Sequence, residues 1–589
     1  MMKRDCVTDL NGTWKFLIDK NDCGGEKGFT APSCDTSCWR EADIPCTFEG
    51  AAQERTGYRG TVWFRRRFAV DKPSEGLLWL EFAAVNYRAD VWINGHPVGS
   101  HVGGFLPFRF EISKFVTAGE NLICVRVNNR VIPGMLPPSH FWRGHGGIIR
   151  NVRLYETPLC RIESVHARKE ENAVRITAKA INASEGGKTV RIRHVCPENG
   201  LSAESTLFVP AGSEAAAEAE FPADAFERWE PDSPVLYTCE TSLMAEGTEG
   251  AEDRCSVTFG VRELRTGDGK IFLNGKEIRL RGFNRHEDSP GKKLATDTAN
   301  AERDFRIMKK MGANFVRFCH YPHSEEELDL CDRLGLLVLA EIPLNAPMVA
   351  IREYNAAETE RALPQIYISA KEAVREMIER DDNHPCIAFW SVSNESNESV
   401  PRLRQINLEL VRYVKKLDRS RFAVHVSQGG WWDNPEIADL LFVEDDVICI
   451  NAYVTMEHMN RKQGENNSVT EEDYRYAAEF WDKRIAYFKE KYPGKPIVVT
   501  EFGYPTCKIS DGILDEQKQA DVLLCDMVSM EGRMAGYAVW HFADHEWEIA
   551  EDGSVFFGSN ISPYGVFRRD RDPKSCVGTI SEYWKNGNI

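Results

Sequence analysis

The chain has 589 residues, with 42% hydrophobic and 10% aromatic side chains and a formal net charge of −17. A chain of this length exceeds what one hydrophobic core supports, so we expect several ordered domains. The negative charge argues against nucleic acid or an anionic membrane surface as a partner.

The amino terminus, M-M-K-R-D-C-V-T-D-L, has no apolar segment of the kind found in secretory leaders, and the chain contains no apolar run long enough to span a membrane. We therefore expect a cytoplasmic protein. Its 17 cysteines are scattered without a C-x-x-C pair, which favours free thiols. Zinc-ligand spacings, phosphate-binding glycine loops and nicotinamide fingerprints are absent from the sequence, so we expect no metal and no cofactor.

Short apolar segments separated by Gly, Pro and Asn occupy the first part of the chain, residues 1–155. They include Thr61–Phe68, Leu77–Phe82, Ala89–Ile93 and Leu122–Val127. Several short strands in series, without a helical period, predict a β-sandwich.

Residues 156–264 alternate polar and apolar side chains, as in Val174–Ala178 and Val190–Arg193. About a hundred residues with this pattern predict a second, immunoglobulin-like β-sandwich. No chemistry-bearing motif occurs in this part, and we expect it to act as a spacer.

From residue 265 to 589, apolar strands alternate with helical stretches. Ser324–Leu334 is a predicted helix, and strands are predicted at residues 336–340, 448–450, 497–499 and 537–539. Repeated β-α units of this kind predict a (β/α)8 TIM barrel. The catalytic groups of such barrels lie at the carboxyl-terminal ends of the strands.

The most informative stretch is R-D-D-N-H-P-C-I-A-F-W-S-V-S-N-E-S-N-E, residues 380–398. Pro385 ends the preceding helix, and the apolar run Cys386–Trp390 predicts a strand buried on both faces. Asn394 and Glu395 follow this strand side by side. They are either catalytic groups or an exposed loop pair, and Glu398 is a competing carboxylate.

A second carboxylate, Glu501, follows the apolar run Ile497–Thr500. Retaining hydrolysis of a glycoside needs one protonated and one ionised carboxyl about 5–5.5 Å apart. The ends of two barrel strands can supply that spacing, which favours Glu395 and Glu501 as a pair.

These segments resemble glycoside hydrolase family 2, which contains β-galactosidases and β-glucuronidases. The acid/base signature of the family is matched at Asn383, His384, Pro385, Trp390, Ser391, Asn394 and Glu395, and E-F-G at residues 501–503 resembles its nucleophile motif. The resemblance implies that Glu395 is the general acid/base, that Glu501 is the nucleophile and that Asn394 binds the sugar 2-hydroxyl.

The same resemblance implies further substrate-binding residues. Arg317 and His320 lie in a second family signature, which departs from the usual pattern at Phe318. The other positions implied by matching segments are Asp288 near the sugar, Glu341 after the next strand, Tyr453 bonded to the nucleophile and Trp540 as the hydrophobic platform. Without the resemblance, His320 and Trp540 would be interpreted as ordinary core residues.

The segments W-H-F-A-D and R-D-R-D-P-K-S resemble the glucuronidase branch. That branch carries Asn-x-Lys, whose lysine grips the sugar carboxylate, whereas this chain has Asn560-Ile561-Ser562. The aspartate that reads the 4-hydroxyl is also missing from the segment around Arg143. Arg143 is either a replacement partner for the carboxylate or a surface arginine.

We therefore predict a retaining exo-β-glycosidase that removes a terminal β-linked hexuronic acid, with galacturonate favoured. β-Glucuronidase is the first alternative and neutral β-galactosidase the second. A catalytically inactive carbohydrate-binding protein is the alternative from another class. The expected partners are small-molecule or oligosaccharide β-uronides, and the oligomeric state stays open, a homo-oligomer included.

Overall fold

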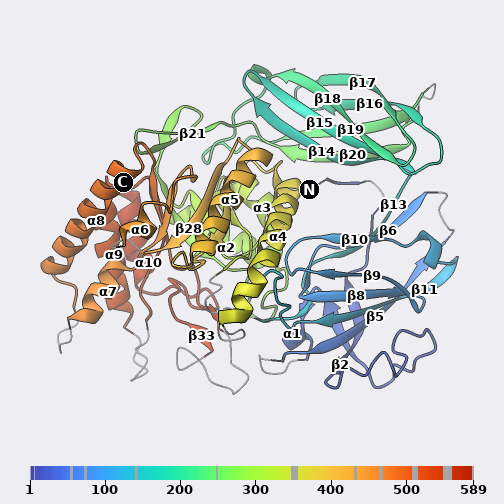
Figure 1. Ribbon diagram of the computed structural model, residues 1–589, viewed down its shortest axis with the longest axis horizontal. Helices are drawn as coiled ribbons and strands as arrows, with labels where there is room; N and C mark the ends of the chain where they lie inside the picture. The colour runs from blue at the N-terminus through green and yellow to red at the C-terminus, as the bar shows by residue number, and fades with distance from the viewer. Residues whose placement is uncertain are drawn as a thin grey trace.

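The computed structural model describes residues 2–4, 7–52, 58–71, 76–138, 144–246, 250–345, 356–429, 434–462, 468–506, 515–547 and 560–586. Figure 1 shows two β-sandwiches, in blue and in green, beside a barrel wrapped by helices in yellow to red. This arrangement confirms the predicted fold class.

The amino-terminal part is a jelly-roll sandwich of antiparallel strands. Its two main sheets have the orders β1-β13-β6-β10 and β3-β2-β5-β11-β8-β9, and a short sheet β4-β12-β7 lies beside them. Large aromatic side chains such as Trp14 and Phe64 fill the core between the sheets. The elements are β1 (Val7–Asp9), β2 (Gly12–Asp19), β3 (Arg40–Ile44), β4 (Cys46–Thr47), α1 (Phe48–Ala52), β5 (Thr61–Val70), β6 (Leu77–Phe82), β7 (Val85–Asn86), β8 (Arg88–Ile93), β9 (His96–Val102), β10 (Phe108–Glu111), the 3-10 helix η1 (Ser113–Phe115), β11 (Gly119–Asn128), β12 (Gly147–Ile148) and β13 (Val152–Thr157).

The second part is an immunoglobulin-like sandwich with the sheets β14-β15-β18 and β17-β16-β19-β20. Every second side chain of β15 is buried, because successive residues of a strand point to opposite faces. The elements are β14 (Cys160–Glu170), β15 (Ala173–Asn182), β16 (Lys188–Cys196), β17 (Leu201–Val209), β18 (Ser213–Pro222), the 3-10 helix η2 (Ala223–Ala225), β19 (Tyr237–Ala245) and β20 (Asp253–Phe259).

A short antiparallel sheet, β21 (Leu264–Gly267), β22 (Lys270–Leu273) and β23 (Lys276–Ile278), leads into the third part. There the strands β24 to β31 close into a parallel barrel, which confirms the predicted TIM barrel. They are β24 (Leu280–Arg285), β25 (Phe315–Phe318), β26 (Leu337–Glu341), β27 (Ile387–Asn394), β28 (Phe422–Gln428), β29 (Ile448–Asn451), β30 (Ile497–Phe502) and β31 (Gly536–Val539). A two-stranded sheet, β32 (His545–Glu546) and β33 (Ile561–Ser562), lies beyond β31.

Helices surround the barrel, and α4 lies on the side that faces the amino-terminal part (Figure 1). Helix α2 begins after Asp297, whose side chain accepts a hydrogen bond from the Asn300 amide, and it ends at Gly312 in the left-handed conformation. The helices are α2 (Thr298–Met311), α3 (Glu325–Leu334), α4 (Ala356–Asp381), α5 (Pro401–Leu417), α6 (Pro435–Ala438), α7 (Val454–Arg461), α8 (Glu471–Lys491), α9 (Glu516–Met530) and α10 (Cys576–Lys585). Within the described ranges, none of them is long and apolar enough to cross a membrane.

Strand β27 continues to Asn394, four residues beyond the predicted apolar run. It does so because the Asn394 amide donates to the carbonyl of Leu344, so the polar end of the strand still has a pairing partner. Every residue of β27 is buried, as expected for a strand covered on both faces.

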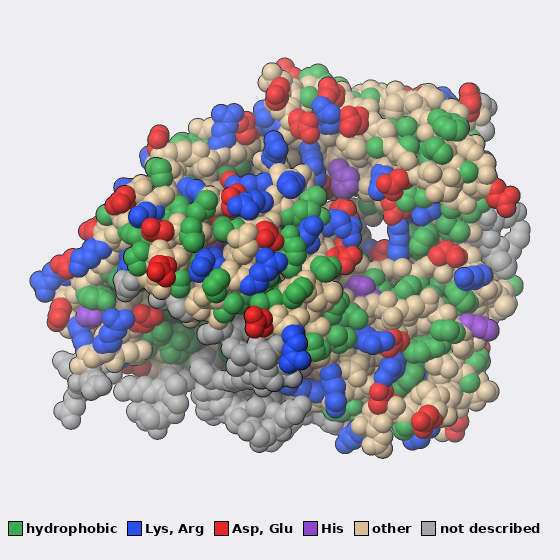
Figure 2. Space-filling model, in the orientation of Figure 1, with side chains coloured by type: hydrophobic (Ala, Val, Ile, Leu, Met, Phe, Trp, Pro, Cys, Tyr) green, Lys and Arg blue, Asp and Glu red, His purple; other side chains and the backbone are tan. Residues whose placement is uncertain are grey.

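A buried ion pair joins the amino-terminal part to the barrel. Arg150 donates to Oε2 of Glu287 at 2.7 Å and to the carbonyls of Phe105 and Pro322. On the face seen in Figure 2, acidic and basic side chains are interspersed. The surface is hollowed between the two sandwiches and the barrel. All cysteines in the described part of the chain are free thiols, as predicted.

Candidate active site

Polar side chains converge at the carboxyl-terminal mouth of the barrel. Asn394 ends β27 and Glu395 follows it, while Glu501 lies near the end of β30. Arg317 and Glu341 occupy the ends of β25 and β26. Because parallel barrel strands all end at the same mouth, residues far apart in the sequence meet there.

Arg317 is the centre of this cluster. Its Nη1 donates to Oε1 of Glu501 at 2.6 Å and to Oδ1 of Asn284 at 3.1 Å. Its Nη2 donates to both carboxylate oxygens of Glu341 and, at 2.7 Å, to Oδ1 of Asn394. Burial alone would lower the pKa of Arg317, but the charges of Glu341 and Glu501 outweigh it and raise that pKa. One buried guanidinium therefore connects the end of its own strand, β25, to the ends of four others.

Glu501 receives hydrogen bonds on both carboxylate oxygens. Arg317 occupies Oε1, and the hydroxyl of Tyr453 donates to Oε2 at 2.9 Å. Burial raises the pKa of Glu501, Arg317 pulls it down, and the charge of Glu395 adds to the rise. Since the two carboxyls repel each other when both are ionised, their titrations are coupled.

Glu395 has a different set of partners. Its Oε1 accepts a hydrogen bond of 2.7 Å from the side-chain amide of Asn451, and burial raises its pKa. The backbone of Glu395 is left-handed, with φ of 48°, and its amide donates to the carbonyl of Val426. An uncommon conformation of this kind at a strand end turns the side chain into the mouth and is typical of functional sites.

His320, Glu341 and Trp540 form one wall of the mouth. The His320 ring stacks on Trp540 with centroids 5.3 Å apart, and its Nδ1 lies 3.0 Å from Oε1 of Glu341. Burial lowers the pKa of His320 to about 4, so the imidazole is neutral at pH 7. Ser391 donates to the other oxygen of Glu341 at 2.8 Å, which holds this carboxylate in place.

Asp288 is buried shortly after the end of β24, and an arginine engages its carboxylate. Arg569 binds both oxygens, at 2.5 and 3.1 Å, and the amide of Glu546 donates to Oδ2. The carboxylate of Asp288 therefore has an ion pair of its own. Glu398, the competing carboxylate of the acid/base segment, is buried beside His425 and Ser427.

The segment that departs from the glucuronidase pattern lies at β33. The carbonyl of Asn560 accepts a hydrogen bond from the Trp547 amide, and Oγ of Ser562 lies 3.3 Å from Nε2 of His541. Arg143, the candidate partner for a sugar carboxylate, lies outside the described residues.

Two asparagines in the cluster were not predicted as site residues. Asn451 donates to Glu395 and to Oδ1 of Asn394, and its own Oδ1 accepts from Thr500. Asn284 accepts from Arg317 and donates to the carbonyl of Thr500. Both are amides at the ends of apolar strands, and that position is the signal that could have identified them.

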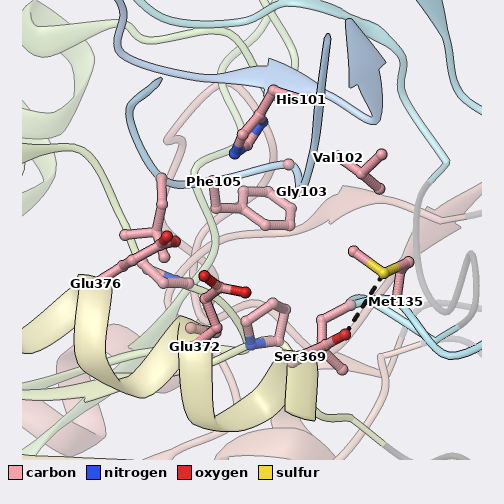
Figure 3. Close-up of a pocket in the computed structure, with 14 residues that line it drawn as sticks. His101, Val102, Gly103, Phe105, Met135, Ser369, Glu372 and Glu376 are labelled. Carbon is pink, nitrogen blue, oxygen red and sulfur yellow. Dashed lines mark hydrogen bonds between the residues drawn. The ribbon is translucent and has the colours of Figure 1, made fainter. Parts of the chain in front are cut away.

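A separate pocket of about 200 Å³ lies between the amino-terminal part and α4 (Figure 3). His101 and Phe105 line it from one side, and Glu372 and Glu376 line it from α4. Arg375 lies 3.6 and 3.5 Å from these two glutamates and pairs more closely, at 2.7 Å, with Glu379. The pocket is distinct from the cluster at the barrel mouth.

The chain matches family models along almost its whole length. Residues 7–158 match the sugar binding domain of glycosyl hydrolases family 2, residues 160–262 match the model named glycosyl hydrolases family 2, and residues 264–589 match the TIM barrel domain of that family.

Curated relatives cover nearly the whole chain. A β-glucuronidase from Felis catus is 27% identical over 98% of this chain and 91% of its own length. A β-glucuronidase from Paenibacillus borealis is 26% identical over 98% and 96%.

Solved structures share the fold. A β-glucuronidase from an uncultured Clostridium sp. is 26% identical, with a TM-score of 0.80 over 99% of this chain and 98% of its own. A family 2 β-galacturonidase from Eisenbergiella tayi, bound to galacturonate, is 24% identical with a TM-score of 0.82 over 100% and 99%. At that identity the second likeness concerns the fold alone.

Proposed function

The chain belongs to glycosyl hydrolases family 2 and is a glycoside hydrolase, and we propose that it removes a terminal β-linked hexuronic acid by a retaining double displacement. The observation that carries this proposal is the unequal environment of two carboxyls at the barrel mouth. Glu501 accepts from a guanidinium and a phenol, whereas the donor to Glu395 is a neutral amide.

Those partners determine which carboxyl keeps a proton. Hydrogen bonds donated to a carboxylate favour its ionised form, and a bond from a charged donor does so most strongly. The proton of the pair therefore stays on Glu395 and Glu501 stays ionised. This assignment is the one that a retaining hydrolase needs, with one acid and one nucleophile.

In the first step the Glu501 carboxylate attacks the anomeric carbon and forms an ester bond to the sugar. The glycosidic bond breaks, its electron pair passes to the leaving oxygen, and Glu395 gives that oxygen its proton. We assign the contact with the sugar 2-hydroxyl to Asn394, whose Oδ1 accepts from Arg317 and Asn451.

In the second step the roles of the pair are reversed. Glu395, now ionised, takes a proton from water, and the water oxygen bonds to the anomeric carbon. The ester bond breaks and its electrons return to Glu501, where Arg317 and Tyr453 stabilise the carboxylate as it forms. The sugar is released with its original anomeric configuration.

Galacturonate is the sugar that we propose. The curated relatives are β-glucuronidases, which supports a β-uronide as substrate. Ser562 stands where that branch carries a lysine, and the aspartate that reads the 4-hydroxyl is missing, so recognition at C4 should differ. We assign the carboxylate contact to Arg143, because a guanidinium binds a carboxylate through two parallel hydrogen bonds.

Steady-state kinetics on a matched set of aryl substrates test the sugar. The set comprises the β-galacturonide, β-glucuronide, β-galactoside and β-glucoside with the same leaving group. We expect the galacturonide to have the highest kcat/KM. A preference for the glucuronide would keep the proposal of a uronidase and refute only the choice of galacturonate. A preference for the neutral galactoside would refute the uronidase proposal.

Covalent trapping tests the mechanism. A 2-fluoro uronide with an activated leaving group should label Glu501, and mass spectrometry of the digest identifies the labelled peptide. Glu501→Gln should abolish labelling and lower turnover by several orders of magnitude. A label on another residue overturns the assignment, and a protein that binds these sugars without turnover or labelling supports the inactive carbohydrate-binding alternative.

A further inference from the structure

Two thiols lie opposite each other in the immunoglobulin-like sandwich, on the neighbouring strands β16 and β19 (Figure 1). The register of these strands runs as far as the pair of Val195 and Glu240, and the next opposed residues are Cys196 and Cys239. Both side chains are fully buried, and their thiols share a hydrogen bond. The Cα atoms of directly opposed residues in an antiparallel pair are about 4.5 or 5.5 Å apart, and disulfides span about 4.4–6.8 Å. A bond between the two sulfurs therefore needs no change of register.

Polar side chains surround this pair inside the core of the sandwich. His194 and Thr241 are opposed on the same buried face of β16 and β19, and they share a hydrogen bond of 2.9 Å. Sγ of Cys239 lies 3.9 Å from Nδ1 of His194 and 3.7 Å from Oγ1 of Thr241. Cys239 is therefore the thiol with the more polar surroundings.

The two thiols differ in reactivity. The hydrogen bond from Cys196 lowers the pKa of Cys239, and His194 acts in the same direction, against the effect of burial. The pKa of Cys196 is raised, because its proton is held by Cys239 and because its side chain is buried. Since the thiolate is the form of cysteine that attacks an oxidant, Cys239 is the sulfur that reacts first.

The ends of the strands give access to the pair. Cys196 is the last residue of β16, and Cys239 is the third residue of β19. Pro197 and Glu198, which follow Cys196, are exposed. The ends of strands open at a lower free energy than a whole domain unfolds, and hydrogen peroxide is little larger than water. A small peroxide can therefore reach Cys239 without unfolding of the sandwich.

We propose that Cys196 and Cys239 are a modification site, at which hydrogen peroxide converts the two thiols into a disulfide that joins β16 to β19. The Cys239 thiolate attacks one peroxide oxygen, the O–O bond breaks, and the hydroxide that leaves takes up the proton released by Cys239. The product on Cys239 is a sulfenic acid. Sγ of Cys196 then bonds to Sγ of Cys239, the S–O bond breaks, and the oxygen leaves as water with the proton of Cys196. Two thiols are oxidised, and one peroxide is reduced to two waters.

Peptide mass spectrometry tests the site on the purified full-length protein. After exposure to hydrogen peroxide and alkylation of the remaining thiols, the digest should contain two peptides joined through Cys196 and Cys239, which dithiothreitol separates. Because the crosslink encloses residues 197–238, it should also slow amide hydrogen exchange in β16 and β19 by at least about tenfold. Cys239→Ser should remove the joined peptides and the slower exchange. Cys124→Ser should keep both, and it is the matched control because that thiol is equally buried in the other sandwich.

The outcomes are independent of the activity of the barrel. Joined peptides in the wild type and in Cys124→Ser, and their absence from Cys239→Ser, support the site. The exposed thiol of Cys38 reports that the oxidant has acted. Oxidation of Cys38 without joined peptides in the wild type overturns the site, and this result needs no variant to fold. Conversion of Cys239 to a sulfinic acid in place of the crosslink, or equally slowed exchange in Cys239→Ser, also overturns the proposal.

Discussion

Tyr453→Phe removes the hydroxyl that donates to Oε2 of Glu501 at 2.9 Å and leaves the rest of the ring in place. This bond is strongest when Glu501 carries full charge, which happens as the sugar ester breaks in the second step. A hydrogen bond to a charged acceptor contributes about 1.5–3 kcal/mol, which corresponds to a slowing of about tenfold to 150-fold. A stopped-flow experiment with a dinitrophenyl β-uronide should therefore show a burst of phenol followed by slow turnover.

The same variant should change the pH dependence of kcat/KM. The hydroxyl favours the ionised form of Glu501, so its loss raises the pKa of the nucleophile. Attack needs the ionised form of Glu501. On acidification, kcat/KM of the variant should therefore begin to fall at a pH about one to two units higher than kcat/KM of the wild type does, which corresponds to the same free energy. Tyr492→Phe is the control, since its buried hydroxyl bonds the carbonyl of Ala438 outside the site. The role of Tyr453 would be refuted if the variant turned over slowly without a burst and if the acidic limb of its pH profile of kcat/KM stayed where it is in the wild type.

Three further changes probe other parts of the molecule. Glu395→Gln should reduce kcat/KM far more for substrates with poor leaving groups than for activated aryl glycosides, and an equal reduction for both would exclude Glu395 as the proton donor. Arg143→Ala should lower kcat/KM for the galacturonide strongly and leave the slow galactoside reaction nearly unchanged, because only the galacturonide carries a carboxylate for Arg143 to bind. Arg150→Met removes the charged partner of the buried Glu287 carboxylate, which keeps only the hydrogen bond from the Ser324 amide. It should lower the free energy of unfolding by about 3–5 kcal/mol, measured by denaturant titration, and a loss under about 1 kcal/mol would contradict this.

The parts of the fold and site that could be predicted are those with a local signal. Cys386–Trp390 is apolar without alternation and ends in polar residues, so a buried barrel strand with functional groups at its end follows from the segment alone. The turn that orients Glu395 is different. Its left-handed backbone depends on the pairing of its amide with Val426 on the neighbouring strand, which only the closed barrel provides.

The contacts that could not be predicted join residues far apart in the chain. Asp288 resembles a sugar-binding residue by its segment, yet Arg569, 281 residues away, engages its carboxylate. His286 approaches Cys319 and His320 only because β24 and β25 are neighbours in the barrel.

The site therefore separates into two layers with different origins. The reacting carboxyls are held by groups at strand ends. Arg317 contacts four of those ends besides its own, and the register of the barrel sets their positions. Of the residues proposed to read the sugar, the segment of Ser562 lies at β33, outside the barrel strands, and Arg143 precedes the barrel in the sequence. Connections change without disturbing strand register. A family signature therefore predicts the chemistry of the bond that breaks, while the choice between epimers depends on residues that the signature does not contain.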